Sequence, residues 1–373
     1  MKKVFVLFLI FIFSGLLGSA SYSQDKIMVS GRLTGKQIAG VQLFMVNPLE
    51  VTSQVRSFVT DENGYFSVEL PSADLVIEKL YASPENYLMI LASAGNEINL
   101  TLNSEKLNQM PEISGSADTR LLYEIAMHTA RNEKLLDSLN SAFAEAQMKD
   151  ETRYLLPEIE DAYARVVEQQ VQQLKSDLWA NASSPASLFF IDKLDVVADF
   201  DVYKKVSDEL FKLYPDFKLI SDLKKRMDIE KQLRPGMKAP DISLPGPDGK
   251  MISLASLQGH IVLIDFWSSW CGPCRKDNPE VVKLYQRFHD RGFEIFGVSL
   301  DRDSLSWTNA IAKDGLVWTH VSDLKYWQSA GAAAYGVKSI PHTVLLDREG
   351  RIIARKLRGK ALESKLEEIF EAE

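Results

Sequence analysis

Two cysteines, Cys271 and Cys274, have the residue type and spacing that could do chemistry. They are the only cysteines among 373 residues and stand in the motif Cys271-Gly272-Pro273-Cys274. Residues three apart on a helix share a face and can form a disulfide. A helix beginning at Cys271 would favour the thiolate there, because unpaired N–H groups and the helix dipole stabilise an anion. Cys271 would then attack or be attacked, and Cys274 would resolve the mixed disulfide.

The cysteine motif also occurs in zinc sites, but this chain offers no second cysteine pair. Its histidines show no zinc-ligand spacing; they are His128, His260, His289, His320 and His342. The sequence therefore predicts no metal site. An inert structural disulfide is the other alternative.

An acid, Asp265, lies six residues before Cys271 inside the apolar run Ile261–Trp267. Burial raises the pKa of a carboxyl group, so Asp265 could take the proton from Cys274 as that thiol attacks the mixed disulfide. The alternative is a hydrogen-bonded core acid. Trp270, next to Cys271, is expected to be exposed and to form part of an apolar landing surface, unless it belongs to the core.

These residues need a strand, a turn and a helix to bring them together. The run Ile261–Trp267 predicts a buried strand, and a helix is expected from Pro273 to about Arg291. A second buried strand, a hairpin and a closing helix should follow, at Phe293–Leu300, Thr343–Leu346 with Arg351–Arg355, and Ala361–Phe370. This order predicts an α/β domain at residues 235–373.

Two regions of different composition precede this domain in the sequence. Residues 24–115 predict a small β-sandwich, because short apolar strands alternate with turn signals such as Asp61-Glu62-Asn63-Gly64. The expected strands are Ile27–Leu33, Val41–Val46, Val55–Val59, Tyr65–Leu70, Tyr87–Leu91 and Ile98–Leu102. Residues 116–234 predict an all-α region from apolar residues at three- and four-residue steps.

The first 23 residues read as a signal peptide. Lys2 and Lys3 precede a short apolar run, and small residues from Gly18 follow it. Cleavage is expected after Ala20 or Ser23, and an uncleaved anchor is the alternative. Either way the rest of the chain would face an oxidising space, in the periplasm or cell envelope. The net charge of −8 gives no basic excess for nucleic acid.

The segment from Ile264 to Cys274, Ile264-Asp265-Phe266-Trp267-Ser268-Ser269-Trp270-Cys271-Gly272-Pro273-Cys274, resembles the active-site strand and motif of thioredoxins. Ala239-Pro240-Asp241 and Asp248-Gly249-Lys250 resemble the domain entry of TlpA/ResA-like thiol–disulfide oxidoreductases. Ser339-Ile340-Pro341 resembles the cis-proline loop of that family. The resemblance covers about residues 236–373 and implies a thioredoxin-like fold. The upstream regions look like N-terminal extensions of Bacteroidota type.

The resemblance also implies roles for individual residues. A cis Pro341 would place the Ile340 backbone beside the disulfide, where a client strand could pair with it. Trp267 would be a platform under the active site. Asp277, one turn beyond Cys274, would tune the thiols, or it is a solvated charge on the helix.

Three features depart from the pattern or stay open. Gly297 stands where thioredoxins place a lysine near the buried acid. The pKa of Asp265 therefore need not be set as it is in thioredoxins. The segment Arg302–Ser329 is longer than in a minimal thioredoxin, resembles the central insertion of the TlpA group, and is expected to add a helix and a strand. His342 would lie near the thiols or merely add local polarity.

The leading functional hypothesis is an exported dithiol reductase of protein disulfides. The dipeptide between the cysteines, Gly272-Pro273, also occurs in strongly reducing thioredoxins, whose reduction potential is about −270 mV. The redox-active disulfide would be its only redox group, and a membrane protein of DsbD/CcdA type would supply electrons. The alternatives are a disulfide isomerase, for which a homodimer would serve, an oxidase, a peroxidase with Ser268 in place of threonine, or a non-catalytic module that binds an envelope partner.

Overall fold

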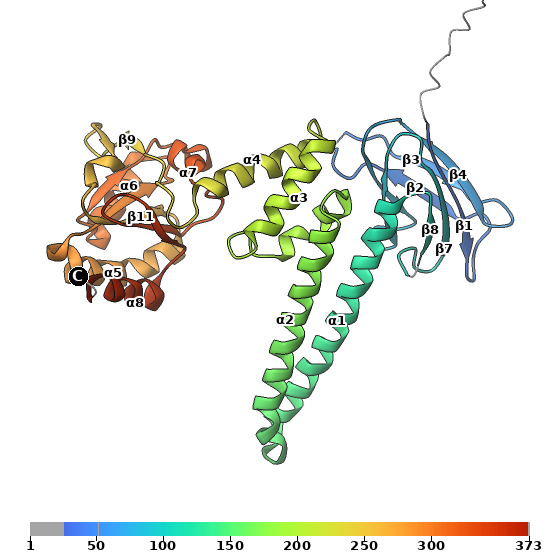
Figure 1. The fold of residues 1–373 in the computed structure, drawn as a ribbon, viewed down its shortest axis with the longest axis horizontal. Helices are drawn as coiled ribbons and strands as arrows, with labels where there is room; N and C mark the ends of the chain where they lie inside the picture. The colour runs from blue at the N-terminus through green and yellow to red at the C-terminus, as the bar shows by residue number, and fades with distance from the viewer. Residues whose placement is uncertain (1–25, 51, 110, 372–373) are drawn as a thin grey trace, which may run out of the picture. The chain divides into compact units, whose positions relative to one another are not determined.

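The computed structural model describes residues 26–50, 52–109 and 111–371 (Figure 1). The predicted signal peptide lies outside these residues. The described chain divides into two compact units. The first extends to Leu174 and includes Ser184–Phe190, and the second comprises Lys175–Ser183 and everything from Ile191 onward. This division differs from the three predicted regions, because the second half of residues 116–234 groups with the C-terminal domain.

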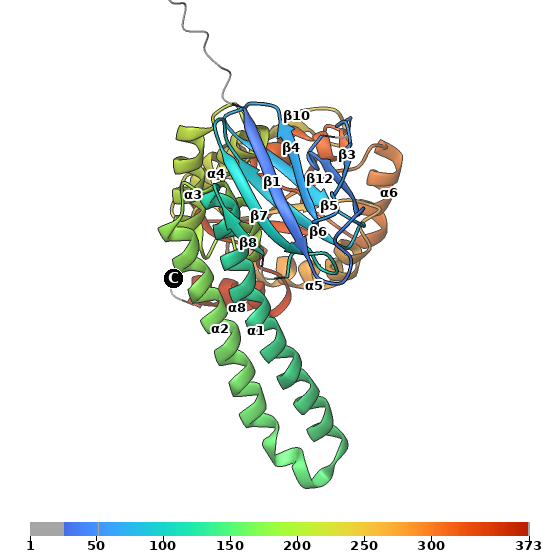
Figure 2. The ribbon, with the colours of Figure 1, turned by 90° about the vertical axis from the view of Figure 1, so that its right-hand side faces the viewer.

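The first unit begins with two four-stranded sheets. One has the order β4-β1-β7-β8 (Figure 2), formed by Tyr65–Leu70, Ile27–Thr34, Glu97–Asn103 and Glu112–Ser114. The other has the order β3-β2-β5-β6, formed by Arg56–Val59, Gln42–Val46, Val76–Tyr81 and Tyr87–Ala92. Side chains of both sheets, including Val29, Leu43 and Leu80, share one buried core. The predicted β-sandwich is thus confirmed.

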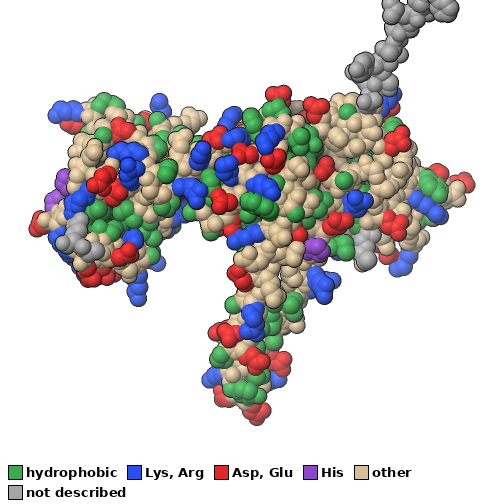
Figure 3. Space-filling view, in the orientation of Figure 1, with side chains coloured by type: hydrophobic (Ala, Val, Ile, Leu, Met, Phe, Trp, Pro, Cys, Tyr) green, Lys and Arg blue, Asp and Glu red, His purple; other side chains and the backbone are tan. Residues whose placement is uncertain are grey.

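Two long helices complete the first unit, α1 at Ala117–Met148 and α2 at Leu156–Ala180, whose last residues belong to the second unit. Ser116 caps α1 by accepting a hydrogen bond from the Thr119 N–H. The hydroxyls of Ser116 and Thr119 both donate to the Leu91 carbonyl of β6, at 2.6 and 2.8 Å. The helix start is therefore bonded to the sandwich. Positive, negative and hydrophobic side chains are mixed on the visible face of the α1–α2 hairpin, toward its tip (Figure 3).

The second unit starts with two shorter helices, α3 at Phe200–Leu213 and α4 at Lys218–Gln232. Leu233, directly after α4, is buried in a core of the C-terminal domain. Glu230 of α4 forms a buried ion pair with Arg355 of that domain. These contacts explain why α4 groups with the domain that follows it. Within the described ranges, no helix has the length and apolarity needed to cross a membrane.

The C-terminal domain has a five-stranded sheet of order β13-β12-β11-β14-β15, formed by Thr319–Val321, Phe293–Ser299, Ile261–Trp267, His342–Leu346 and Ile352–Arg355. The first three strands are parallel, and β14 and β15 run antiparallel to their neighbours. This arrangement, with helices on both faces, is the predicted thioredoxin-like fold.

Helices cover the two faces of this sheet differently. On one face pack α5 at Gly272–Phe288, α6 at Ser304–Asp314 and α8 at Gly359–Glu371. On the other lie Leu233 and the short helix α7 at Ala330–Ala334. The expected helix and strand within Arg302–Ser329 are α6 and β13. A small hairpin, β9 at Ser243–Pro245 and β10 at Met251–Ser253, precedes the sheet.

Candidate active site

The two cysteines form a disulfide at the start of α5. Strand β11 ends at Trp267, and Cys271 is the N-cap of α5, with its Sγ accepting a hydrogen bond from the Cys274 N–H at 3.2 Å. The Cα atoms of the pair are 5.3 Å apart. Cys271 is 4% exposed and Cys274 3%. In the oxidised protein the bond therefore holds both sulfur atoms in the core, and the two side chains are buried to nearly the same extent.

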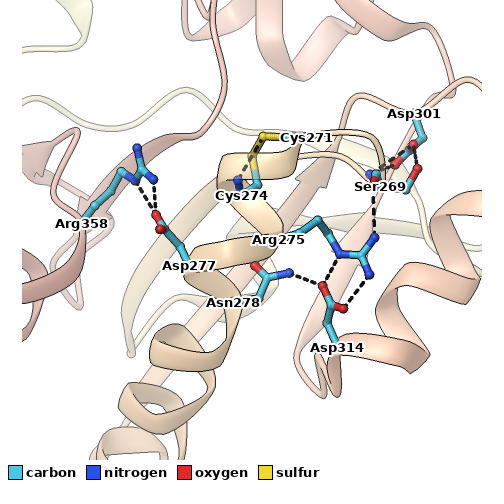
Figure 4. Close-up of a disulfide and its surroundings, with 9 residues drawn as sticks. All are labelled: Ser269, Cys271, Cys274, Arg275, Asp277, Asn278, Asp301, Asp314 and Arg358. Atoms are coloured by element: carbon cyan, nitrogen blue, oxygen red, sulfur yellow. Dashed lines mark hydrogen bonds and ion pairs between the residues drawn. A yellow bond between two sulfur atoms is a disulfide. The ribbon is translucent and has the colours of Figure 1, made fainter.

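The loop between β11 and α5 is held through Ser269 (Figure 4). Its N–H and hydroxyl donate to buried Asp301, which follows β12. Its carbonyl accepts from the Arg275 guanidinium at 3.1 Å. Arg275 also pairs with Asp314 at the end of α6, and Asn278 donates to the same carboxylate. Two elements outside the motif therefore fix the loop that carries Cys271. Sequence spacing gives no sign of these long-range bonds.

The acid Asp265 lies in the middle of β11 and is 9% exposed. It lines a pocket of ≈ 500 Å³ together with Cys274, Pro341 and Thr343. Burial raises the pKa of the Asp265 carboxyl to about 7; the positive charge of Arg358 opposes the shift, and the negative charge of Asp277 adds to it. The carboxyl group, with its pKa near neutrality, thus shares a pocket with Cys274.

Asp277, from α5, forms an ion pair with Arg358, which lies just before α8 (Figure 4). The Nε of Arg358 donates to the Asp277 carboxylate at 2.8 Å. Both residues line the pocket beside Asp265. Asp277 is therefore half-exposed and paired, rather than freely solvated. Sequence reasoning missed Arg358, because it stands 81 residues from its partner.

Gly297 occupies the position directly across from Asp265, in the neighbouring strand β12. A Cβ atom at Gly297 would lie 2.4 Å from the Nδ1 of His320. The buried His320 ring also packs edge-on against Trp267, with centroids 5.5 Å apart, and burial lowers its pKa to about 3. A side chain at position 297 would thus meet a neutral ring, and Arg358 is a cation that acts on Asp265.

The remaining predicted site residues lie around the same junction. The Ile340–Pro341 peptide bond is cis, as the family resemblance implies. Ile340 is half-buried, and Pro341 lines the pocket with Cys274. Trp267 is buried in the core under the motif, whereas Trp270 is 46% exposed. Their positions agree with the expected platform and landing surface, and their roles stay predictions.

His342 does not lie near the thiols. It pairs with Phe266 in the register of β14 and β11, so its side chain lies on the face opposite Asp265. The ring packs edge-on against Phe266, and burial lowers its pKa to about 4. Of the two interpretations offered for His342, this position fits a residue that adds local polarity in the core. In the described part of the chain, no three His, Cys, Asp or Glu side chains gather so that they could hold a metal ion.

Comparison with known proteins gives matches to the thioredoxin-like domain. A family model described as Redoxin matches residues 234–369. The thiol–disulfide oxidoreductase ResA of Bacillus thuringiensis strain Al Hakam is 30% identical over 124 residues, which cover 33% of this chain and 70% of that protein. ResA of Bacillus subtilis strain 168 is 31% identical over 118 residues, covering 32% and 64%.

Two solved structures are also similar. The thioredoxin domain of a thiol–disulfide oxidoreductase from Bacteroides vulgatus is 38% identical, covers 37% of this chain and 99% of its own, and has a TM-score of 0.35. A thiol–disulfide oxidoreductase from Bacteroides fragilis is 36% identical, covers 35% and 98%, and has a TM-score of 0.34.

Proposed function

Because this chain belongs to the TlpA/ResA-like thiol–disulfide oxidoreductases of the thioredoxin superfamily, we propose that it reduces protein disulfides through Cys271 and Cys274. One observation carries the proposal: the two cysteines meet at the start of α5, and Cys274 shares a pocket with Asp265. That arrangement gives a nucleophile, a resolving thiol and a base with a pKa near neutrality.

The reaction begins with the reduced pair. The Cys271 thiolate attacks one sulfur of the client disulfide, and the client S–S bond breaks. The attacked sulfur stays bonded to Cys271 in a mixed disulfide. The other client sulfur leaves as a thiolate that takes a proton from solvent. Cys274 then gives its proton to the Asp265 carboxylate and attacks the Cys271 sulfur. The mixed disulfide breaks, the second client thiolate leaves, and the Cys271–Cys274 disulfide forms. Two electrons have passed to the client.

The enzyme must be reduced again after each cycle, and a membrane dithiol protein of DsbD/CcdA type is the proposed donor. The oxidising space implied by the N-terminal residues is the proposed location, and disulfide-bearing envelope proteins are the proposed clients. The redox-active disulfide is the only redox group that this cycle uses. Support for the location comes from Lys2, Lys3 and the apolar run after them.

Reduction of insulin disulfides tests the catalytic assignment. The purified protein, supplied with a dithiol, should accelerate insulin precipitation, and Cys271→Ala should abolish the acceleration. Tyr154→Ala, an exposed residue of the first unit, is the matched control and should keep it. Activity that survives in Cys271→Ala would remove Cys271 from the role of nucleophile.

The direction of electron flow is tested by the reduction potential. Equilibration of the Cys271–Cys274 pair with glutathione or a stronger dithiol gives this value. The reduction potential of a reductase should be about −270 mV, whereas a value of about −120 mV would identify the protein as an oxidase. If a dimeric form of the protein rearranges the disulfides of a client without net reduction, the protein is an isomerase instead.

Client trapping tests the partners. Cys274→Ser keeps the nucleophile and removes the resolving thiol, so mixed disulfides at Cys271 should accumulate in cells. Mass spectrometry of these species would name both clients and donor. Cys271→Ser with Cys274 intact is the matched control and should trap far less, because Cys274 is predicted to act only after Cys271.

A further inference from the structure

Beside the redox motif, three aromatic side chains form a cluster that we name the aromatic shelf: Trp270, Tyr326 and Trp327. The ring centroids of Trp270 lie 5.1 Å from Tyr326 and 6.1 Å from Trp327, and Tyr326 lies 5.6 Å from Trp327. Trp270 is 46% exposed and Trp327 is 38% exposed. The motif loop supplies one ring, and the segment after β13 supplies the other two.

The backbone under the shelf is held in an unfavourable conformation. Leu324 and Tyr326 have φ angles of 54° and 57°, the left-handed region that non-glycine residues rarely adopt. Side-chain hydrogen bonds fix this turn: Ser322 accepts from the Leu324 N–H at 3.1 Å, and Asp323 accepts from the Ala330 N–H at 2.8 Å. Strain of this kind clusters at functional sites, and the turn that holds it carries the half-buried Tyr326 and the exposed Trp327.

The charges around the shelf are mostly engaged. The guanidinium of Arg302 lies 4.2 Å from the centroid of the Tyr326 ring. The carboxylate of Asp301 is bonded to Ser269, and that of Asp303 caps α6 by accepting from the Ser306 N–H. Together with Trp270 and Tyr326, these residues line an open hollow of ≈ 520 Å³. The hollow therefore presents aromatic faces beside the Arg302 cation and the hydrogen-bonded carboxylates of Asp301 and Asp303.

We infer that Tyr326 and Trp327 extend Trp270 into a binding surface for an aromatic or aliphatic side chain next to the reacting cysteine of a client protein. The inference rests on the proposed function. Disulfide exchange needs the client sulfur within bonding distance of the Cys271 sulfur. Residues flanking the client cysteine must then pass over the neighbouring Trp270. Aromatic side chains at a surface bind apolar side chains by area burial and by edge-to-face contact.

Two disulfide-bonded peptides test the inference. They are identical except that phenylalanine or glycine precedes the cysteine, and the rate of their reduction by the fully reduced full-length protein is followed by mass spectrometry. The phenylalanine peptide should react roughly three- to tenfold faster than the glycine peptide. In Trp327→Ala this ratio should fall toward one. Tyr326→Gly should lower it too, and glycine accepts the local φ angle, so the turn is retained.

Tyr154→Ala removes an exposed tyrosine of the first unit and should leave the ratio unchanged. Equal rates for both peptides in the unaltered protein would overturn the inference and leave the proposed function standing. Failure to reduce either peptide would instead overturn the proposed function. A concentration-dependent dimer that Trp327→Ala abolishes, with equal peptide rates, would assign the shelf to a second copy of the chain.

Discussion

At the scale of single residues, the proposed base Asp265 should make the resolving step of the dithiol depend on pH. Its carboxyl group is buried in the sheet and shares a pocket with Cys274, and its pKa is raised to about 7. Below that pH the group is protonated and cannot accept the proton of Cys274. Above it, the carboxylate is available as a base. The step that resolves the mixed disulfide should therefore accelerate as pH rises through 7 and then level off.

This pH dependence can be measured directly. A mixed disulfide between Cys271 and a chromophoric thiol would be resolved by Cys274, and stopped-flow absorbance would follow the released thiol from pH 5 to 9. Asp265→Asn should slow resolution roughly 100-fold at pH 8 and remove the midpoint near 7. Asp248→Asn, in an exposed turn, is the control. An unchanged midpoint in Asp265→Asn would assign the titration to another group.

Arg358 and Asp277 should shift that midpoint in opposite directions. Arg358 stabilises the Asp265 carboxylate and Asp277 destabilises it. Arg358→Ala should therefore raise the pKa of Asp265, and Asp277→Asn should lower it. The pH profile of resolution, or the NMR titration of the carboxyl carbon, measures the shifts. Shifts of the same sign in both variants would contradict this electrostatic account.

At the scale of elements, α6 and α5 together hold the loop that carries Cys271. Arg275 connects three groups: the Ser269 carbonyl in the loop, Asp314 at the end of α6, and through Asp314 the amide of Asn278. The Asp314 side chain is only 14% exposed, so loss of Arg275 would leave a partly buried charge that is bonded to Asn278 alone among these groups. This ion pair consequently differs from the solvated pairs elsewhere on α5.

Two alanine substitutions on α5 test the difference. Arg275→Ala should lower the free energy of unfolding by about 2–4 kcal/mol, because the Asp314 charge and the Ser269 carbonyl lose their partner. Lys283→Ala breaks only an exposed pair with Glu280 and should cost less than about 0.5 kcal/mol. Urea unfolding followed by tryptophan fluorescence gives both values. Equal losses would show that Arg275 contributes no more than a surface charge.

The elements around the motif could be predicted, because their signals are local. The uninterrupted apolar run of β11 and the helix-start pattern at Cys271 identify strand, turn and helix. Strand β5 was missed, since Glu78 and Lys79 interrupt its apolar residues, and only the fold shows that Arg56 pairs with the buried Glu78 carboxylate. Arg358, Asp314 and the aromatic shelf could not be predicted for another reason. Their partners are close in space but distant in sequence.

At the scale of the whole molecule, the described chain forms two compact units. The sandwich and most of the α1–α2 hairpin form the first unit, and α3, α4 and the thioredoxin-like domain form the second. All six tryptophans lie in the second unit, at positions 179, 267, 270, 307, 318 and 327. Tryptophan fluorescence therefore reports unfolding of the second unit, whereas circular dichroism reports both.

A core substitution in the sandwich separates the two signals. Leu80 is fully buried between the sheets, so Leu80→Ala should destabilise the first unit by about 2–5 kcal/mol. In urea, part of the circular dichroism transition should move to lower concentration while the fluorescence transition stays in place. The comparable substitution Leu366→Ala, in α8, should move the fluorescence transition instead. Equal movement of both signals in Leu80→Ala would mean that the units unfold as one.

The single disulfide has a practical consequence for spectroscopy. Both cysteines of the chain are bonded to each other, so the oxidised protein offers no competing thiol to a maleimide reagent. One cysteine introduced on the sandwich and one on α8 would take spin labels specifically, without prior removal of native cysteines. Label-to-label distances recorded before and after reduction would then report whether turnover of the redox centre moves one unit against the other.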